Sequence, residues 1–259
     1  MLTSDVLEPR PDFYIAAMGR SGSTALGNWF TQAPERLVFS EPFLTRTANP
    51  RLLRIQLADF GMPASDWEWG QADESASDRF RRLMAPRLRN RRWAFKEVLC
   101  EEHERVLAMF APPRLILTVR DMRDVALSFF EKHRIQQNLH RFSDAWVEEY
   151  CLRESDGLVC LRNKLDERGI AHRVARYEDF TRSAEALHGI AAFVGWEGGG
   201  RVDSHLAKFD RQFEAHRHGA FFSDRPRLPD ERQLGPAERL AADEIGERCS
   251  AYQAAFGYA

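Results

Sequence analysis

The sequence predicts an α/β fold with a central, mostly parallel sheet of about five strands. Two segments, FYIAAM and RLILTVR, are continuous apolar runs, which are typical of parallel strands covered on both faces. Helical patterns separate most of the strand segments, and this alternation is the pattern of α/β folds. The predicted strands are Phe13 to Met18, Leu37 to Ser40, Arg92 to Val98, Arg114 to Arg120 and His172 to Tyr177. We expect ligands to bind where the strands end.

Helices are predicted in the segments between and after these strands. They cover residues 23–32, 50–60, 75–88, 101–110, 121–134, 143–165 and 178–196. The last segment, 236–259, is predicted as one amphipathic helix packed on the sheet, with Leu240, Ile245 and Tyr252 as candidates for the core or for a homodimer contact. Because no repeat or linker divides the chain, we expect a single domain over residues 1–259.

Composition excludes several classes of protein. The 37 basic and 39 acidic side chains nearly balance, so the overall charge gives no case for binding nucleic acid. No apolar run approaches the roughly 18 residues that span a bilayer, and the first residues lack the features of a signal peptide. Four scattered cysteines and eight histidines show no metal-ligand spacing. We therefore expect a cytoplasmic protein with no membrane span and no metal.

The segment GRSGST, residues 19–24, lies between the first predicted strand and a helix. Backbone N–H groups in such a loop, together with the positive end of the helix, form a site for an anion. Arg20 adds a positive charge, and the loop hydroxyls add donors. The motif of nucleoside-triphosphate loops is absent, because Gly22 is followed by Ser23 where that motif requires lysine. The alternative is a tight turn with serine caps.

A second candidate site for an anion follows the fourth predicted strand. Arg120 ends that strand, and Ser128 lies about two turns into the next helix, for which Asp121 is the predicted N-cap. The Arg120 guanidinium can bind a phosphate through two N–H groups, with the Ser128 hydroxyl beside it. The alternative is that Arg120 pairs with Asp121 or Asp124.

At these residues the sequence resembles the sulfotransferase family that uses 3′-phosphoadenosine 5′-phosphosulfate (PAPS). The 5′-phosphosulfate loop of that family reads [KR]-[ST]-G-[ST]-T, and its 3′-phosphate motif is an arginine at a strand end with a serine eight residues on. The segments SEPF (40–43) and RYEDF (176–180) are also similar to bacterial and carbohydrate-type members. The resemblance covers roughly residues 12 to 195, and the order and spacing of the motifs make it specific.

The resemblance implies a P-loop-like three-layer α/β/α fold. It implies a nucleotide-binding enzyme that transfers a sulfuryl group from PAPS, leaving 3′-phosphoadenosine 5′-phosphate (PAP), without a metal. The acceptor would be a hydroxyl, less readily an amine, of a small molecule, a glycan or a lipid-linked compound. The residues implied in donor binding are Gly19, Arg20, Ser21, Gly22, Ser23, Thr24, Arg120 and Ser128, with Arg217 and Gly219 as a weaker match to a segment that folds over the 3′-phosphate. For Arg217 and Gly219 the alternative is a surface loop.

Catalytic candidates follow from the same resemblance. Arg20 is the candidate cation for the 5′-phosphate and the bridging oxygen. Glu41 is the favoured general base, directly beside the anion-binding loop if the first two strands are neighbours, and the alternative for it is a structural acid before a proline. Lys96 matches a lysine of aryl and steroid relatives that lies on the leaving oxygen, so it is a candidate for stabilising the leaving group; the alternative is a lysine at a strand end that reaches solvent. Val98 stands where those relatives have a histidine base. Glu97 is therefore the second candidate for the base.

Two other functions stay open at the level of sequence. One is a divergent P-loop kinase or NTPase, which needs a lysine near Gly22 and an acidic strand end for magnesium. The other is a nucleotide-binding module without catalysis. The acceptor is not predicted, and its pocket is expected in residues 44–90 and 129–150.

Overall fold

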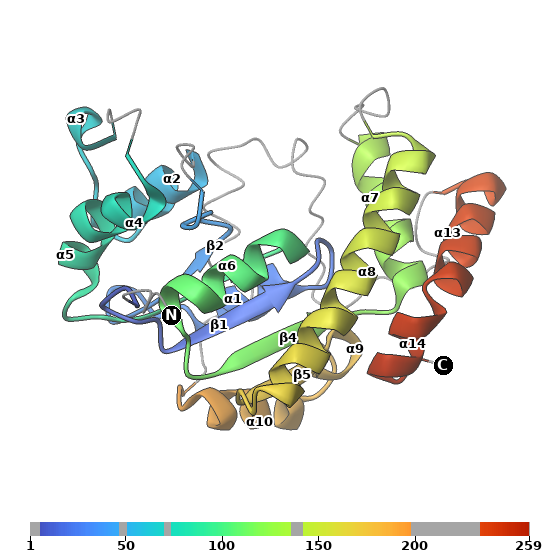
Figure 1. Ribbon diagram of the computed structural model, residues 1–259. Helices are drawn as coiled ribbons and strands as arrows, with labels where there is room; N and C mark the ends of the chain where they lie inside the picture. Colours follow the sequence, from blue (N-terminus) through green and yellow to red (C-terminus); the bar gives the residue numbers. More distant parts are fainter. Residues whose placement is uncertain (1–5, 47–50, 70–73, 136–141, 198–233, 259) are drawn as a thin grey trace.

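The computed structural model describes residues 6–46, 51–69, 74–135, 142–197 and 234–258, and its core is one five-stranded parallel sheet (Figure 1). The strands are β1 (Phe13–Ala17), β2 (Arg36–Ser40), β3 (Arg92–Glu97), β4 (Leu115–Val119) and β5 (His172–Arg176). Their order in the sheet is β2-β3-β1-β4-β5, and every pairing is parallel. The predicted parallel sheet and its five strands are confirmed, and no strand start or end differs from its prediction by more than one residue.

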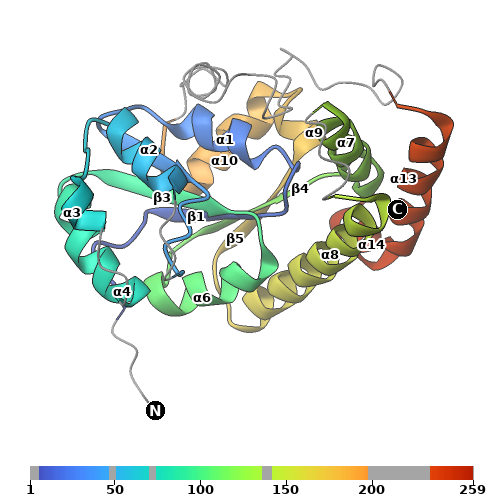
Figure 2. The same cartoon turned by 90° about the horizontal axis from the view of Figure 1, so that it is seen from above.

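Helices cover both faces of the sheet (Figure 2). β1 is central, and its side chains alternate between two apolar layers although every residue of the strand is buried. Phe13 and Ile15 pack with α1 (Ser23–Phe30), α9 (Tyr177–Phe180) and α10 (Ala184–Val194). Tyr14 and Ala16 face the opposite layer, which includes α6 (Cys100–Phe110) and α8 (Asp144–Glu167). This three-layer arrangement explains the continuous apolar runs in the sequence.

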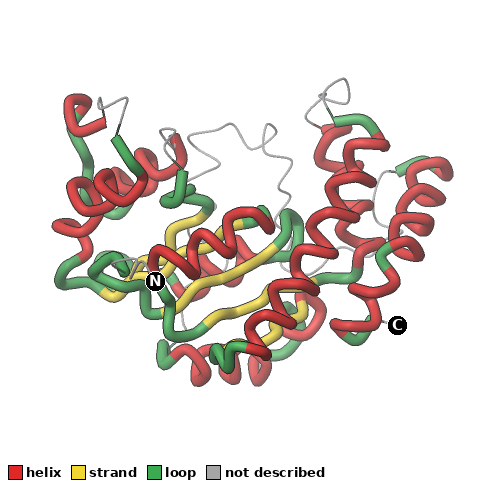
Figure 3. Tube along the Cα trace, in the orientation of Figure 1, coloured by secondary structure: helices red, strands yellow, loops and turns green. Residues whose placement is uncertain are grey.

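Further helices flank the two ends of the sheet (Figure 3). Near β2 lie α2 (Arg51–Asp59), α3 (Asp66–Trp69), α4 (Ala76–Arg79), the π-helix η1 (Phe80–Met84) and α5 (Ala85–Leu88). α7 (Met122–Ile135) follows β4 and packs against α8. None of the helices in the described part of the chain has the length and apolarity that a bilayer span requires.

The C-terminal segment differs from its prediction as one helix on the sheet. It forms α13 (Pro236–Arg248) and α14 (Ser250–Phe256), separated at Cys249, where the backbone leaves helical geometry. Both pack against α8, and α13 also contacts α7, because these helices already cover the adjoining face. Ile245 and Tyr252 are buried, whereas Leu240 is 60 % exposed and lies outside the core.

Candidate active site

The predicted site residues gather at one edge of the sheet. Residues 19–24 follow β1, Glu41 follows β2, Lys96 and Glu97 end β3, and Arg120 follows β4. Because all five strands are parallel, their carboxyl ends share this edge, which is where α/β folds bind ligands. The topology therefore joins segments that are about 100 residues apart in sequence.

The loop after β1 makes a tight turn into α1. Arg20 and Gly22 both have positive φ angles, 69° and 81°. At Gly22 a side chain has no room, since an added Cβ would lie 2.2 Å from Cδ2 of Tyr177. The Ser21 hydroxyl donates to the carbonyl of Met18 at 2.8 Å, so it stabilises the turn from within. The turn thus needs glycine at residue 22 and a small hydroxyl side chain at residue 21.

The start of α1 keeps the electrostatics that favour an anion. Its N-cap is Gly22, no side chain caps its first turn, and that turn holds no acidic residue. The positive end of the helix dipole is therefore not offset by a carboxylate of the helix itself. Ser23 and Thr24 are the first two residues of this helix. The Gly19 amide is already bound, because it donates to the Tyr150 hydroxyl at 2.8 Å.

The two predicted anion-binding motifs are in direct contact. Arg20 donates from Nε to the Ser128 hydroxyl at 2.8 Å, and Arg120 donates from Nη1 to the carbonyl of Arg20 at 3.3 Å. Ser128 therefore lies against the arginine of the loop, whereas the sequence predicts it beside Arg120. The two motifs are therefore joined by hydrogen bonds between the loop after β1 and the residues that follow β4.

Arg120 is held from several sides and is only 5 % exposed. Its guanidinium lies 4.2 Å from the centre of the Tyr177 ring, and its Nη2 lies 3.3 Å from a carboxylate oxygen of Asp124. The pairing with Asp124, raised as an alternative from the sequence, is thus present. This pairing leaves part of the Arg120 guanidinium without a partner, because the buried Nε has no hydrogen-bond partner among the described residues. A buried donor of this kind is available to a water molecule or to a ligand.

Glu41 reaches the site by a route that differs from the expected one. β1 and β2 are not neighbours, since β3 lies between them. The Glu41 amide donates to the carbonyl of Lys96 at 2.9 Å, and the Lys96 ammonium donates to Glu41 Oε1 at 2.7 Å. The Lys96 side chain is buried, 1 % exposed, whereas that of Glu41 is 30 % exposed. Lys96 therefore holds Glu41 at the edge where the strands end.

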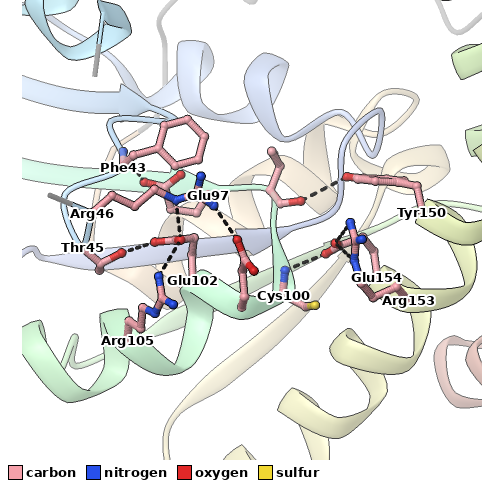
Figure 4. A network of polar contacts seen from close by, with 12 residues as sticks. Phe43, Thr45, Arg46, Glu97, Cys100, Glu102, Arg105, Tyr150, Arg153 and Glu154 are labelled. Carbon is pink, nitrogen blue, oxygen red and sulfur yellow. Dashed lines mark hydrogen bonds and ion pairs between the residues drawn. The ribbon is translucent and has the colours of Figure 1, made fainter. Parts of the chain in front are cut away.

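Two buried carboxylates anchor the segment that follows Glu41 (Figure 4). Glu97 Oε1 accepts from the amide of Phe43 at 2.7 Å. Glu102, on α6, accepts from the Thr45 hydroxyl and from Arg46 Nε, the latter at 2.7 Å. These contacts hold residues 43–46 down on β3 and α6.

The backbone of this segment is strained. Glu41 and Phe43 have φ angles of 53° and 47°, in the left-handed region that costs an ordinary residue roughly 1–2 kcal/mol. The contact of Phe43 with Glu97 offsets part of that cost. Several contacts therefore hold the segment in a strained conformation, as is common where a side chain must be positioned toward a ligand.

Glu41 and Glu97 differ in what they can do chemically. Glu97 is 1 % exposed, and burial, followed by the charge of nearby Glu41, raises its pKa well above the ordinary value for glutamate. Its Oε2 has no partner among the described residues. Glu41 is partly open to solvent, whereas Glu97 is buried. Of these two carboxylates, Glu41 is therefore the one that a ligand can contact directly.

Two residues at this edge were not singled out from the sequence for the site. Tyr150, on α8, accepts from the Gly19 amide and donates to the carbonyl of Val98 at 3.1 Å, which ties the loop to β3. Lys132, on α7, has its pKa lowered to about 8 by burial and by the charge of Arg20. Its position four residues after Ser128, on the same helix face, is a signal that could have found it.

The remaining predicted residues, Arg217 and Gly219, lie outside the described part of the chain. Within the described ranges, no three side chains of His, Cys, Asp or Glu gather as a metal site. The residues brought together at the sheet edge are thus the loop 19–24, Glu41, Lys96, Glu97, Arg120 and Ser128.

Comparison with known proteins supports the fold. No protein-family model matches the sequence, and no curated protein matches it at a significant level. The crystal structure of sulfotransferase STF9 from Mycobacterium avium matches 98 % of this chain and 78 % of its own, with a TM-score of 0.54 and 15 % identity. A sulfotransferase from Alicyclobacillus acidocaldarius matches 80 % of this chain and 94 % of its own, with a TM-score of 0.44 and 14 % identity. The similarity to the first shows a shared fold, and the predicted P-loop-like three-layer architecture is confirmed.

Proposed function

We propose that this chain is a PAPS-dependent sulfotransferase that transfers a sulfuryl group to a hydroxyl, less readily an amine, of a small-molecule, glycan or lipid-linked acceptor. The observation that carries the proposal is the contact of Arg20 with Ser128, which joins two anion-binding motifs at the edge where the strands end. A ligand with two separate anionic groups fits such a site. The fold shared with a bacterial sulfotransferase supports the same conclusion.

The donor-binding part of the proposal rests on the two arginines. Arg120 offers an unsatisfied buried Nε and is assigned to the 3′-phosphate, with Ser128 nearby. Arg20 and the start of α1 are assigned to the 5′-phosphosulfate, because the helix dipole and the guanidinium favour negative charge there. Arg217 and Gly219 remain predicted contacts of the 3′-phosphate. We further propose that the chain acts in the cytoplasm as one domain.

The transfer step is assigned to side chains that lie beside the loop. The acceptor oxygen forms a bond to sulfur while the bond from sulfur to the bridging oxygen of the donor breaks, and PAP leaves. Glu41 takes the proton of the acceptor hydroxyl, and Lys96 holds the Glu41 carboxylate in place through their 2.7 Å contact. Arg20 stabilises the charge that develops on the leaving phosphate. The sulfuryl group carries less negative charge than a phosphoryl group, so side chains can supply this stabilisation.

Calorimetric titration with PAP, beside ATP with magnesium, tests the donor site. We expect micromolar binding of PAP that does not depend on magnesium. Arg120→Met should weaken it by roughly 10- to 100-fold, the range for hydrogen bonds to charged groups. Arg123→Met is the matched control, since Arg123 faces α13 and pairs there with Asp243, away from the site. Magnesium-dependent ATP binding without affinity for PAP would show that the chain is a divergent kinase instead.

A transfer assay with labelled PAPS and a panel of phenols, sugars and lipid alcohols then tests catalysis. Glu41→Gln should keep the affinity for PAP and lose transfer, because the amide cannot accept the proton. Unchanged transfer in Glu41→Gln would move the base elsewhere. If no acceptor reacts although PAPS binds tightly, the chain is better described as a nucleotide-binding module.

A further inference from the structure

Lys132 stands beside the site on α7. The helix starts at Met122, just after Arg120, and rises away from the sheet (Figure 1). Ser128 and Lys132 are one turn apart, so they share a face of the helix, and Lys132 lies roughly 6 Å farther from the sheet edge. Because Ser128 contacts Arg20, this face of α7 points toward the loop after β1. Lys132 therefore lies above that loop.

The electrostatic surroundings of Lys132 agree with this placement. Burial and the charge of Arg20 lower its pKa to about 8, and the charge of Glu41 acts in the opposite direction. Lys132 is thus within electrostatic range of both the cation assigned to the donor and the carboxylate assigned to the acceptor. In the proposed reaction, the sulfuryl group passes from the donor bound at Arg20 to the acceptor beside Glu41.

Lys132 has no partner of its own among the described residues. The side chain is half-buried, yet it forms no hydrogen bond or ion pair there. Its neighbours on the helix are engaged, since Arg134 pairs with Glu238 and His133 stacks between Phe129 and Phe142. Partial burial of an ammonium without a partner is costly. The arrangement is therefore expected where a ligand supplies the anion.

The ion pairs that the other cations of the site already form indicate which part of a ligand Lys132 binds. Arg120 faces Asp124, and Lys96 faces Glu41. A phosphosulfate carries two negative charges, one on the phosphate and one on the sulfate. Arg20 and the start of α1 suit the phosphate, and Lys132, one helical turn farther from the sheet, suits the sulfate.

We propose that Lys132 is a further catalytic residue that binds the sulfate oxygens of the donor between Arg20 and Glu41. The inference rests on the proposed function and deepens it. PAP lacks the sulfate, so Lys132 distinguishes PAPS from PAP, whereas Arg120 binds both.

Calorimetric titrations of PAPS and of PAP, without acceptor, test this assignment. In Lys132→Met we expect the affinity for PAPS to fall by roughly 10- to 100-fold, as for a lost hydrogen bond between charged groups, and the affinity for PAP to change less than about twofold. Lys132→Arg keeps the charge and should retain most of the preference for PAPS. Lys164→Met is the matched control, because Lys164 lies on α8 and pairs with Glu104 away from the site.

A pH series separates ligand binding from a structural role. The preference of the unmodified protein for PAPS over PAP should decline as pH rises through about 8, where Lys132 loses its proton, and Lys132→Arg should keep it. The two charged groups that act on Lys132 are Arg20 and Glu41, and arginine and glutamate side chains ordinarily titrate far from pH 8. If Lys132→Met loses affinity for PAP and PAPS equally, or keeps its affinity for both, the assignment of Lys132 is wrong while the proposed function stands. Failure of the unmodified protein to bind PAP would overturn the proposed function as well.

Discussion

Gly22 gives a sharp test of how the anion-binding loop is built. Substitution by alanine adds one methyl group at a residue with a φ angle of 81°. The added Cβ would lie 2.2 Å from Cδ2 and 2.7 Å from Cε2 of Tyr177, and 3.1 Å from Cζ of Phe180. The Tyr177 ring also contacts the Arg120 guanidinium, at 4.2 Å. The methyl group therefore perturbs both the loop and the second arginine.

The expected cost of Gly22→Ala has two parts. The left-handed backbone conformation costs an alanine roughly 1–2 kcal/mol. Forcing the Tyr177 and Phe180 rings aside adds roughly 1–3 kcal/mol, the usual range for overpacking. Gly61→Ala is the matched control, since Gly61 has a φ angle of 71° and nothing within 4 Å of an added Cβ. Only the first part applies to Gly61.

Urea unfolding of both variants measures the difference directly. We expect Gly22→Ala to be less stable than Gly61→Ala by about 1–3 kcal/mol, or by roughly 2–12 °C in Tm for a chain of this size. Gly22→Ala should also bind PAP more weakly, because displacement of the Tyr177 ring loosens Arg120. Equal stability of the two variants would refute the packing of Tyr177 against the loop.

Two further predictions concern the supports of the site. Tyr150→Phe should lower the free energy of unfolding by about 1–3 kcal/mol, since the Gly19 amide and the Val98 carbonyl lose their partner; an unchanged urea midpoint would contradict this. Burial raises the pKa of Glu97 in the folded state. The contribution of Glu97 to stability is therefore greatest below the unfolded-state pKa of about 4.3, and it is lost as pH rises toward the folded-state pKa. Glu97→Gln should therefore gain stability relative to the unmodified protein as pH rises from 5 to 9, by about 1.4 kcal/mol per unit of pKa shift across that range. A constant difference between the two proteins over that range would show that Glu97 is ionised in the folded state.

The strands were predictable because their signal is local. FYIAAM and RLILTVR are apolar without interruption, and the structure shows why, since helices cover both sides of β1 and β4. The residues that follow strand ends, such as Arg20 and Arg120, could then be placed at one edge by the rule for parallel sheets. This much of the site follows from local pattern and chain direction.

Other parts of the fold and of the site depend on contacts between segments that are far apart in sequence, so no single segment predicts them. The position of β3 between β1 and β2 is a property of the assembled sheet, so the route by which Glu41 reaches the site through Lys96 was not foreseen. The break at Cys249 was missed because the helical pattern continues across it. Lys132 was missed because a lysine near the end of a helix is common. Only the folded structure shows that this face of α7 is turned toward Arg20.

The sheet order also sets a constraint on synthesis of the chain. β1 is central and pairs with β3 and β4, which begin at Arg92 and Leu115, so the apolar strand leaves the ribosome long before either neighbour exists. The last residue of β4 is Val119, about 100 residues after β1, and at roughly 5–20 residues per second this leaves β1 incompletely paired for roughly 5–20 s. Exposed apolar strands of this kind are aggregation-prone and are bound by chaperones. The strand that places the anion-binding loop is therefore also a segment that needs protection while the protein is being made.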